Sequence, residues 1–253
     1  MNLEQHYAEI VLNRSQDGNA LDLVMVTEIC HALTALQKST TIKTLVIKAS
    51  GNAFCVGGDL NYIFENKKGV EAAIDELLVV WNSVISMLSE WPNIVFVIVE
   101  GAVGGGGLGL VVSADYVLAG EDATFTAGFD RIGLSCDSSI SWYLPRLIGV
   151  RKAKQILLHG KSLDSQQAYD VGLIDEVLSV SDVGQRVIEL IDQFVQYSSV
   201  STSATKKLIN QSFDRNISQQ MESEREFIKV CAATSESQNK IGKLLDKLNR
   251  THK

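Results

Sequence analysis

Four consecutive glycines, Gly104 to Gly107, interrupt the apolar segment IVFVIVEGAVGGGGLGLVVSAD (94–115). Glycine loses more backbone freedom on folding than any other residue, so an ordered run of four is costly. The residues before the run predict a buried strand, and those after it predict a short helix. We therefore expect the bare backbone of this turn to face something that side chains would obstruct.

Two kinds of nucleotide site do not fit this glycine turn. A phosphate-binding loop would end in Gly-Lys-Ser/Thr, whereas Gly107 is followed by Leu108 and Gly109. Gly104, Gly106 and Gly109 do match the dinucleotide pattern G-x-G-x-x-G, but the helix must end before Asp115 and is too short to cross over. Two interpretations stay open: a turn that offers backbone N–H groups to a carbonyl oxygen, and close helix–strand packing without a ligand.

A second glycine turn favours the first interpretation. The segment AFCVGGDL (53–60) also follows a predicted strand, TLVIKAS (44–50), and frees backbone N–H groups. Two such turns after neighbouring parallel strands would place two donors on one oxygen. That arrangement is an oxyanion hole, which stabilises negative charge as it develops on a substrate oxygen.

The rest of the chain predicts α/β layers followed by a helical tail, because strands and helices alternate in the first half and helices dominate the second. The net charge of −7 argues against a nucleic-acid partner. The four cysteines show no C-x-x-C spacing, so we expect neither a metal site nor disulfides. Without a signal-peptide pattern at the start or an apolar run of about 20 residues, we expect a cytoplasmic protein with no membrane partner.

Several segments, taken in order, resemble the crotonase family, the enoyl-CoA hydratase/isomerase superfamily. They are IVLNR…GNAL (10–21), AFCVGGDL (53–60), EGAVGGGGLGLVVSADYVLAGEDATF (100–125), IGL…WYLPRLIG (132–149) and LLHGKSLDSQQAYDVGLIDEV (157–177). The resemblance implies an α/β fold, a crotonase-like β-β-α spiral over 1–198 with a C-terminal helical region over 199–253. It also implies a homotrimer or hexamer, which would cover apolar residues of the tail such as Phe227, Val230, Leu244 and Leu245.

The resemblance further implies an acyl-CoA substrate, whose thioester enolate two backbone N–H groups stabilise. Carried over by position, these donors are the amides of Val56 and Gly106. The other residues expected to line the acyl-CoA site are Gly57, Gly58, Asp59, Gly105 and Phe129. Coenzyme A enters as part of the substrate thioester, and no further cofactor is implied.

The sequence departs from the hydratases of this family at both catalytic glutamates, whose positions hold Gly109 and Phe129. Hydration by paired glutamates is therefore not expected, because nothing there deprotonates a water. Asp137, in GLSCDSSISWYLPRL, instead matches an aspartate found in ring-opening and double-bond isomerases of the phenylacetate-pathway type, in dienoyl-CoA isomerases and in aryl-CoA dehalogenases. Asp137 would also suit the role of a helix cap.

The leading hypothesis is an enoyl-CoA isomerase that moves a C=C bond by a 1,3-proton shift, with Asp137 as the acid and base. The alternatives are an atypical hydratase, a decarboxylase or a dehalogenase on the same fold, or an inactive acyl-CoA-binding scaffold. We expect Phe129, Ile140 and Trp142 to line an apolar pocket around Asp137, with Ile140 narrowing it. The sequence leaves open whether the acyl group belongs to fatty-acid or aromatic-acid metabolism.

Overall fold

A computed structural model describes residues 6–39 and 41–251, and the chain divides into two compact units at the boundary between Ile191 and Asp192. The structure does not describe residues 1–5 and 40, which belong to the predicted region 1–198, or residues 252–253, which belong to the predicted region 199–253. The first unit carries the sheets and the candidate site, and the second is helical.

The larger sheet in the described part of the first unit is parallel throughout. Its strands run in the order β1 (Tyr7–Leu12), β2 (Thr44–Ala49), β4 (Ile94–Val99), β6 (Tyr116–Gly120) and β9 (Glu176–Leu178). The central strands TLVIKA and IVFVIV are continuous apolar runs rather than alternating ones, apart from Thr44 and Lys48. Such runs are typical of parallel strands covered on both faces.

A second, smaller sheet follows in the order β3 (Ala53–Cys55), β5 (Ala102–Gly104), β7 (Thr124–Thr126) and β8 (Leu163–Asp164), with only the β7–β8 pair antiparallel among the described strands. Each of β3, β5 and β7 directly follows a strand of the larger sheet. The chain therefore advances strand, strand, helix, which is the β-β-α spiral that the sequence predicted. The two glycine turns lie at the ends of the neighbouring strands β3 and β5.

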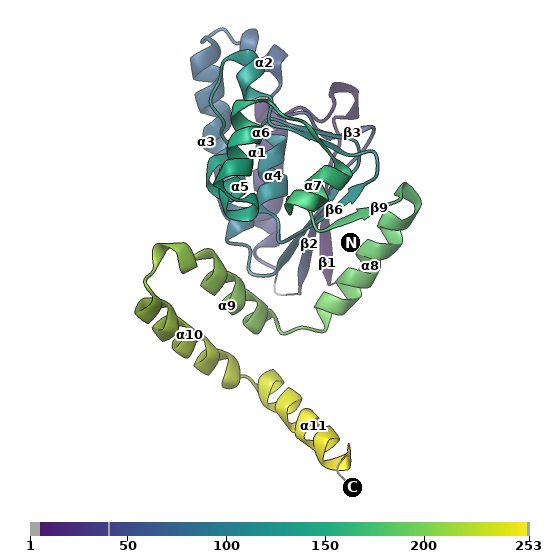
Figure 1. Cartoon of the computed structure of the whole chain (residues 1–253), viewed down its shortest axis with the longest axis vertical. Coiled ribbons are helices and arrows are strands. Elements are labelled where there is room, and N and C mark those ends of the chain that lie inside the picture. Colours follow the sequence, from purple (N-terminus) through teal and green to yellow (C-terminus); the bar gives the residue numbers. More distant parts are fainter. Residues whose placement is uncertain (1–5, 40, 252–253) are drawn as a thin grey trace. The chain divides into compact units, whose positions relative to one another are not determined.

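The helices of the first unit are α1 (Leu23–Leu36), α2 (Leu60–Phe64), α3 (Val70–Ser89), α4 (Gly107–Ser113), α5 (Ile140–Ile148), α6 (Val150–Leu158), α7 (Ser165–Val171) and α8 (Val180–Val195), which crosses the unit boundary. Short 3-10 turns cover Ser15–Asp17 (η1) and Phe129–Ile132 (η2). Helix α3 contacts α1, α2 and α4, and α4 contacts α5 (Figure 1). The Asp22 side chain accepts the Met25 N–H and caps α1.

Helix α3 is the longest helix of the described residues and the only one of them apolar enough to cross a membrane by length and composition. One face of this helix is nevertheless buried in the first unit. That face carries Ala73, Leu77, Trp81, Val84, Ile85 and Leu88. Helix α3 therefore serves as a core helix, and its burial holds Trp81 in place beneath the candidate site.

The second unit consists of α9 (Ser199–Asn210), the 3-10 turn η3 (Ser212–Asp214), α10 (Ile217–Ala232) and α11 (Ser235–Thr251), after the end of α8. A reciprocal capping box of Asn216 and Gln219 begins α10. The two last helices leave large apolar side chains exposed in the single chain: Ile217, Met221, Ile228, Val230, Ile241, Leu244, Leu245 and Leu248.

Candidate active site

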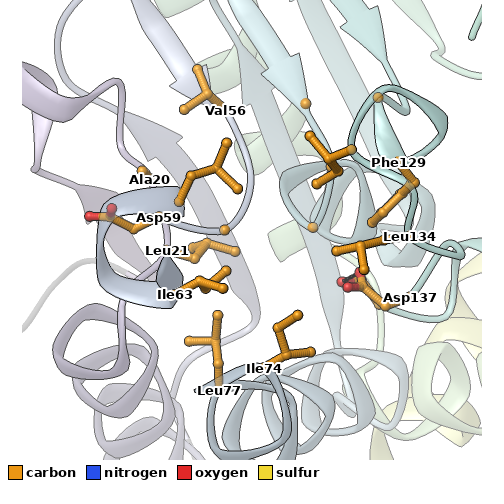
Figure 2. Close-up of a pocket in the computed structure, with 18 of the residues that line it drawn as sticks. Ala20, Leu21, Val56, Asp59, Ile63, Ile74, Leu77, Phe129, Leu134 and Asp137 are labelled. Carbon is orange, nitrogen blue, oxygen red and sulfur yellow. Dashed lines mark hydrogen bonds between the residues drawn. The ribbon is translucent and has the colours of Figure 1, made fainter. Parts of the chain in front are cut away.

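A cavity of about 920 Å³ opens in the first unit between the two glycine turns and helices α2 and α3 (Figure 2). Most of its wall is apolar, with contributions from Leu21, Ile63, Ile74, Leu77, Phe129 and Leu134. Seven of the eight residues predicted for the site line it among the described residues: Val56, Gly58, Asp59, Gly105, Gly106, Phe129 and Asp137. The eighth, Gly57, lies behind the wall, where it contacts the second glycine turn.

The first glycine turn offers a different amide from the one that the sequence suggested. The Val56 N–H donates to the Gly18 carbonyl oxygen at 3.1 Å, so it is not free to bind a substrate oxygen. The Leu21 N–H donates to the Gly57 carbonyl oxygen at 2.7 Å. Because the C=O and N–H of a trans peptide point in opposite directions, the Gly58 N–H points away from Leu21. Among the described residues it has no acceptor, which makes Gly58 the available donor of this turn.

The second glycine turn holds its own free amide next to the first. The Gly105 N–H is bound by the carbonyl oxygens of Thr126 and Ala127, at 3.2 and 3.1 Å. The next amide, that of Gly106, belongs to the N-cap residue of α4 and has no acceptor among the described residues, as expected at the start of a helix. The sequence prediction of Gly106 as a candidate donor therefore fits the geometry.

The run of glycines also lets the two turns touch. A Cβ atom at Gly57 would lie 3.0 Å from the Gly104 carbonyl oxygen, and one at Gly107 would lie 2.6 Å from the Cys55 carbonyl oxygen. Gly57 and Gly105 moreover have positive φ angles of 98° and 45°. The close packing expected of the glycine run is therefore present, and it brings two amides without an acceptor among the described residues to one cavity wall.

Asp137 faces this cavity from the opposite wall to Asp59, and Figure 2 shows its carboxylate turned into the cavity. Burial raises its pKa, while the Ser138 hydroxyl, which donates to Asp137 Oδ1 at 2.6 Å, and its own backbone N–H partly oppose that rise. Helix α5 begins at Ile140 after Ser139, with no side-chain cap. The capping role considered for Asp137 is therefore not present in the structure.

The Ser138 side chain also explains why residue 109 is a glycine. A Cβ atom at Gly109 would lie 2.7 Å from Ser138 Cβ and 2.8 Å from the Ser138 carbonyl oxygen. A glutamate at this position would require the turn that carries Asp137 to move. The other departure, Phe129, adds an apolar ring to the cavity wall and is 7% exposed. Gly109 thus leaves room for the turn at Ser138, and Phe129 supplies apolar surface. Neither position supplies a carboxylate.

A family model described as enoyl-CoA hydratase/isomerase matches residues 2–253. The chain belongs to this family. It is 25% identical over 248 residues to the 1,2-epoxyphenylacetyl-CoA isomerase of Escherichia coli K12, covering 97% of this chain and 94% of the relative. It is 28% identical over 215 residues to the trans-2-decenoyl-[acyl-carrier-protein] isomerase of Streptococcus mutans serotype c, covering 83% and 81%.

The fold agrees with solved structures of enoyl-CoA hydratase/isomerase proteins. The crystal structure of an enoyl-CoA hydratase from Polaromonas sp. JS666 superposes with a TM-score of 0.91 at 27% identity, covering 96% of this chain and 95% of that one. The α/β spiral with C-terminal helices is therefore shown, and so is an acyl-CoA-processing role at the level of the family.

Two residues of the first glycine turn, Asp59 on the cavity wall and Cys55 buried outside it, suit neither acid–base nor nucleophilic chemistry. Burial opposes ionisation of Asp59, but the Tyr62 N–H and the Arg14 guanidinium, 2.9 Å from Oδ2, outweigh it and lower its pKa. Asp59 also caps α2 through the N–H groups of Asn61 and Tyr62. Cys55 is fully buried, and burial raises its pKa to about 12, so its thiol stays protonated.

Sequence reasoning misplaced two residues of the wall and missed two others. Ile140 is fully buried and packs in the core, and Trp142 lies outside the cavity, where its ring stacks on the Arg146 guanidinium at 3.8 Å. The missed residues are Trp81 and Ser138, whose side chains bond each other across 57 positions of sequence. No local pattern signals such a pair, because Trp81 lies on α3 and Ser138 in the turn before α5, so that only tertiary packing brings them together.

Proposed function

We propose that this family member is an acyl-thioester double-bond isomerase, which moves a C=C bond along the acyl chain by a 1,3-proton shift. The observation that carries the proposal is the isolation of Asp137. Its carboxylate is partly buried, is turned into the cavity and has no ion-pair partner among the described residues, unlike that of Asp59, and the two positions that hold hydratase glutamates are glycine and phenylalanine.

The proposed reaction uses Asp137 twice. The ionised carboxylate removes a proton from a carbon next to the double bond, and the electron pair moves through the chain onto the thioester oxygen. The N–H groups of Gly58 and Gly106 stabilise that charge, each worth about 10²–10³ in rate when well placed. The neutral Asp137 then returns the proton at the other end of the three-carbon unit. No electrons or atoms are gained or lost overall.

The raised pKa of Asp137 supports this double role. A general base and acid works best when its pKa lies near the working pH, because both protonation states are then accessible. Burial moves the pKa of Asp137 in that direction, whereas the bonds that lower the pKa of Asp59 move it the other way. Asp137 is therefore the better proton carrier of the two aspartates on opposite walls.

The apolar wall favours an apolar acyl chain over a polar one. The carrier of the thioester is proposed to be coenzyme A, in keeping with the family. The Streptococcus mutans relative is named for a thioester on acyl carrier protein, so the same acyl group on that carrier is the natural comparison.

The test follows 3-enoyl and 2-enoyl thioesters of several chain lengths, on coenzyme A and on acyl carrier protein, by proton NMR in D₂O. An isomerase interconverts the two series and exchanges deuterium at C2 and C4 without adding water. Formation of a 3-hydroxyacyl product would support the atypical hydratase, and loss of CO₂ or halide from suitable thioesters would support a decarboxylase or a dehalogenase. Tight binding with no turnover on any thioester would support the scaffold.

A further inference from the structure

Three side chains form a hydrogen-bonded series that ends on the proposed catalytic carboxylate. Trp81 Nε1 donates to Ser138 Oγ at 3.0 Å, and Ser138 Oγ donates to Asp137 Oδ1 at 2.6 Å. Trp81 and Ser138 are 1% and 2% exposed, so water does not compete for these bonds. The series starts on core helix α3 and reaches the cavity wall.

The direction of this series is fixed by chemistry. An indole N–H can only donate, so the Ser138 oxygen must accept from Trp81. A serine hydroxyl has one proton and two acceptor lone pairs, of which Trp81 uses one. The hydroxyl proton is donated to Asp137 Oδ1, and an ionised carboxylate can only accept it.

We propose that Trp81 is a positioning residue for Asp137. Acting through the Ser138 hydroxyl, it holds Oδ1 as a permanent acceptor and leaves the second oxygen to take up and return the transferred proton. This inference rests on the proposed proton shift. It adds a residue that acts on the substrate-facing carboxylate through Ser138, without touching the substrate itself.

The backbone conformation around Ser138 needs support from its surroundings, and the hydrogen-bonded series can provide it. Ser138 and Ser139 are consecutive non-glycine residues with positive φ angles, 55° and 61°, a conformation that persists only when its surroundings hold it. A Cβ atom at Gly106 would lie 3.2 Å from Ser138 Oγ and 3.5 Å from Trp81 Nε1. The bond from Trp81 therefore fixes this turn directly beside one of the two proposed oxyanion donors.

Other charged groups do not account for the ionisation behaviour of Asp137. Helix α4 carries no titratable side chain, and the acidic residues of α3, which are Glu71, Asp75 and Glu76, precede Trp81 by more than a turn. Within the described residues, the remaining charged side chains of the cavity wall are Asp17, Asp59 and Arg131. None of these contributes to the pKa of Asp137. Burial raises that pKa, and hydrogen bonds from the Ser138 hydroxyl and the Asp137 amide lower it.

The test measures the Asp137 carboxyl directly, by ¹³C NMR titration of protein labelled at aspartate side-chain carboxyls, with Asp137→Asn identifying the resonance. Two variants interrupt the series, Trp81→Phe and Ser138→Ala. Trp91→Phe is the matched control, because Trp91 is also a buried indole, 2% exposed, whose N–H has no partner in the described structure. Thermal unfolding of each variant separates lost packing from lost hydrogen bonding.

We expect Ser138→Ala to shift the Asp137 titration upward by about one pH unit or more, because a bond to the charged form is lost. Trp81→Phe should shift it in the same direction by less, and Trp91→Phe should leave it unchanged. The acidic limb of the pH profile of kcat/KM should also shift upward, most in Ser138→Ala, less in Trp81→Phe and not at all in Trp91→Phe. An unchanged titration in Trp81→Phe would overturn the inference, whether or not Ser138→Ala shifts it.

The titration stands apart from the proposed reaction. An enzyme in which Asp137→Asn retains full isomerase activity, but in which Ser138→Ala still shifts the carboxyl titration, would contradict the proposed function and support the series. The reverse pattern, an inactive Asp137→Asn with no shift in the other two variants, would support the function and remove Trp81 from it.

Discussion

The Cβ atom of Ser138 lies 2.7 Å from the place where a Cβ atom of residue 109 would be. Gly109→Ala should therefore displace the turn that carries Asp137. We expect loss of about 1–3 kcal/mol of unfolding free energy, as for other overpacked sites, together with a fall in turnover. Urea unfolding and turnover assays check both.

Gly184→Ala is the control for that substitution. Gly184 lies inside α8, has an ordinary φ angle and has nothing within 4 Å of its added Cβ atom. Alanine there should raise the unfolding free energy by about 0.5–1 kcal/mol, as expected in a helix interior, and leave turnover unchanged. Equal effects of the two alanines would contradict the steric role of Ser138.

The ion pair between Arg14 and Asp59 should matter for the first donor amide. Arg14 donates to Asp59 Oδ2 at 2.9 Å and to the Ala20 carbonyl oxygen at 2.6 Å, beside the turn that holds Gly58. Arg14→Met would leave the Asp59 carboxylate, 9% exposed, without its cation. We expect about 1–3 kcal/mol of lost stability and a lower kcat, since Gly58 is less firmly placed.

Lys48→Met provides the comparison for Arg14. The Lys48–Glu9 pair is 2.9 Å long, but its side chains are 37% and 36% exposed. An exposed pair of this kind contributes about 0–1 kcal/mol. Chemical denaturation should show this difference, and similar losses in the two variants would mean that Arg14 acts only as a surface charge.

Stability should depend on pH through Asp137. Its pKa is raised in the folded state, so the folded protein binds a proton more readily than the unfolded chain. That contribution is present at acidic pH and is lost as the pH rises through the folded pKa. Asp137→Asn should thus exceed the wild type in unfolding free energy at pH 8, with the gap closing towards pH 4. A constant gap across that range would show that the pKa is not raised.

The exposed apolar faces of the second unit lead us to propose a homotrimer or a hexamer. Leu244 and Leu245 are 58% and 54% exposed in the single chain. Exposed apolar patches of this kind mark association surfaces. Sedimentation equilibrium should give a trimer or a multiple of it, and Leu244→Asp with Leu245→Asp should shift the protein to smaller species. A stable wild-type monomer at micromolar concentration would contradict the proposal.

Much of the fold was accessible from patterns along the chain. The spacing of apolar residues over 69–90 predicts a helix, and the structure has one at Val70–Ser89; the apolar run over 94–101 predicts a strand, and the structure has one at Ile94–Val99. These elements are long and strongly periodic, so apolar spacing alone defines them. The motif around Asp137 likewise predicted a carboxylate at the site, because the family resemblance fixed its position in the chain.

The remaining features depend on contacts between distant segments. The motif AFCVGGDL predicted a turn with free amides, but the Gly18 carbonyl oxygen, from a different turn, decides that Val56 is occupied and Gly58 is free. The direction of Ile140 and Trp142 depends on where α5 begins, and two residues with positive φ angles precede it. Periodicity does not predict such a turn, so the sequence does not determine which side chains of α5 reach the cavity.

Turnover of Asp137→Asn is the most direct test of Asp137 as the carrier of the proton. Asparagine keeps the shape of the side chain and an oxygen for the Ser138 hydroxyl, but it cannot carry the proton. Asp130→Asn makes the same change on the neighbouring 3-10 turn, outside the cavity wall. We expect both variants to bind the acyl thioester normally, the isomerisation rate to fall about 10²-fold or more in Asp137→Asn, and the rate to stay unchanged in Asp130→Asn. Full isomerase activity in Asp137→Asn would contradict that role of Asp137.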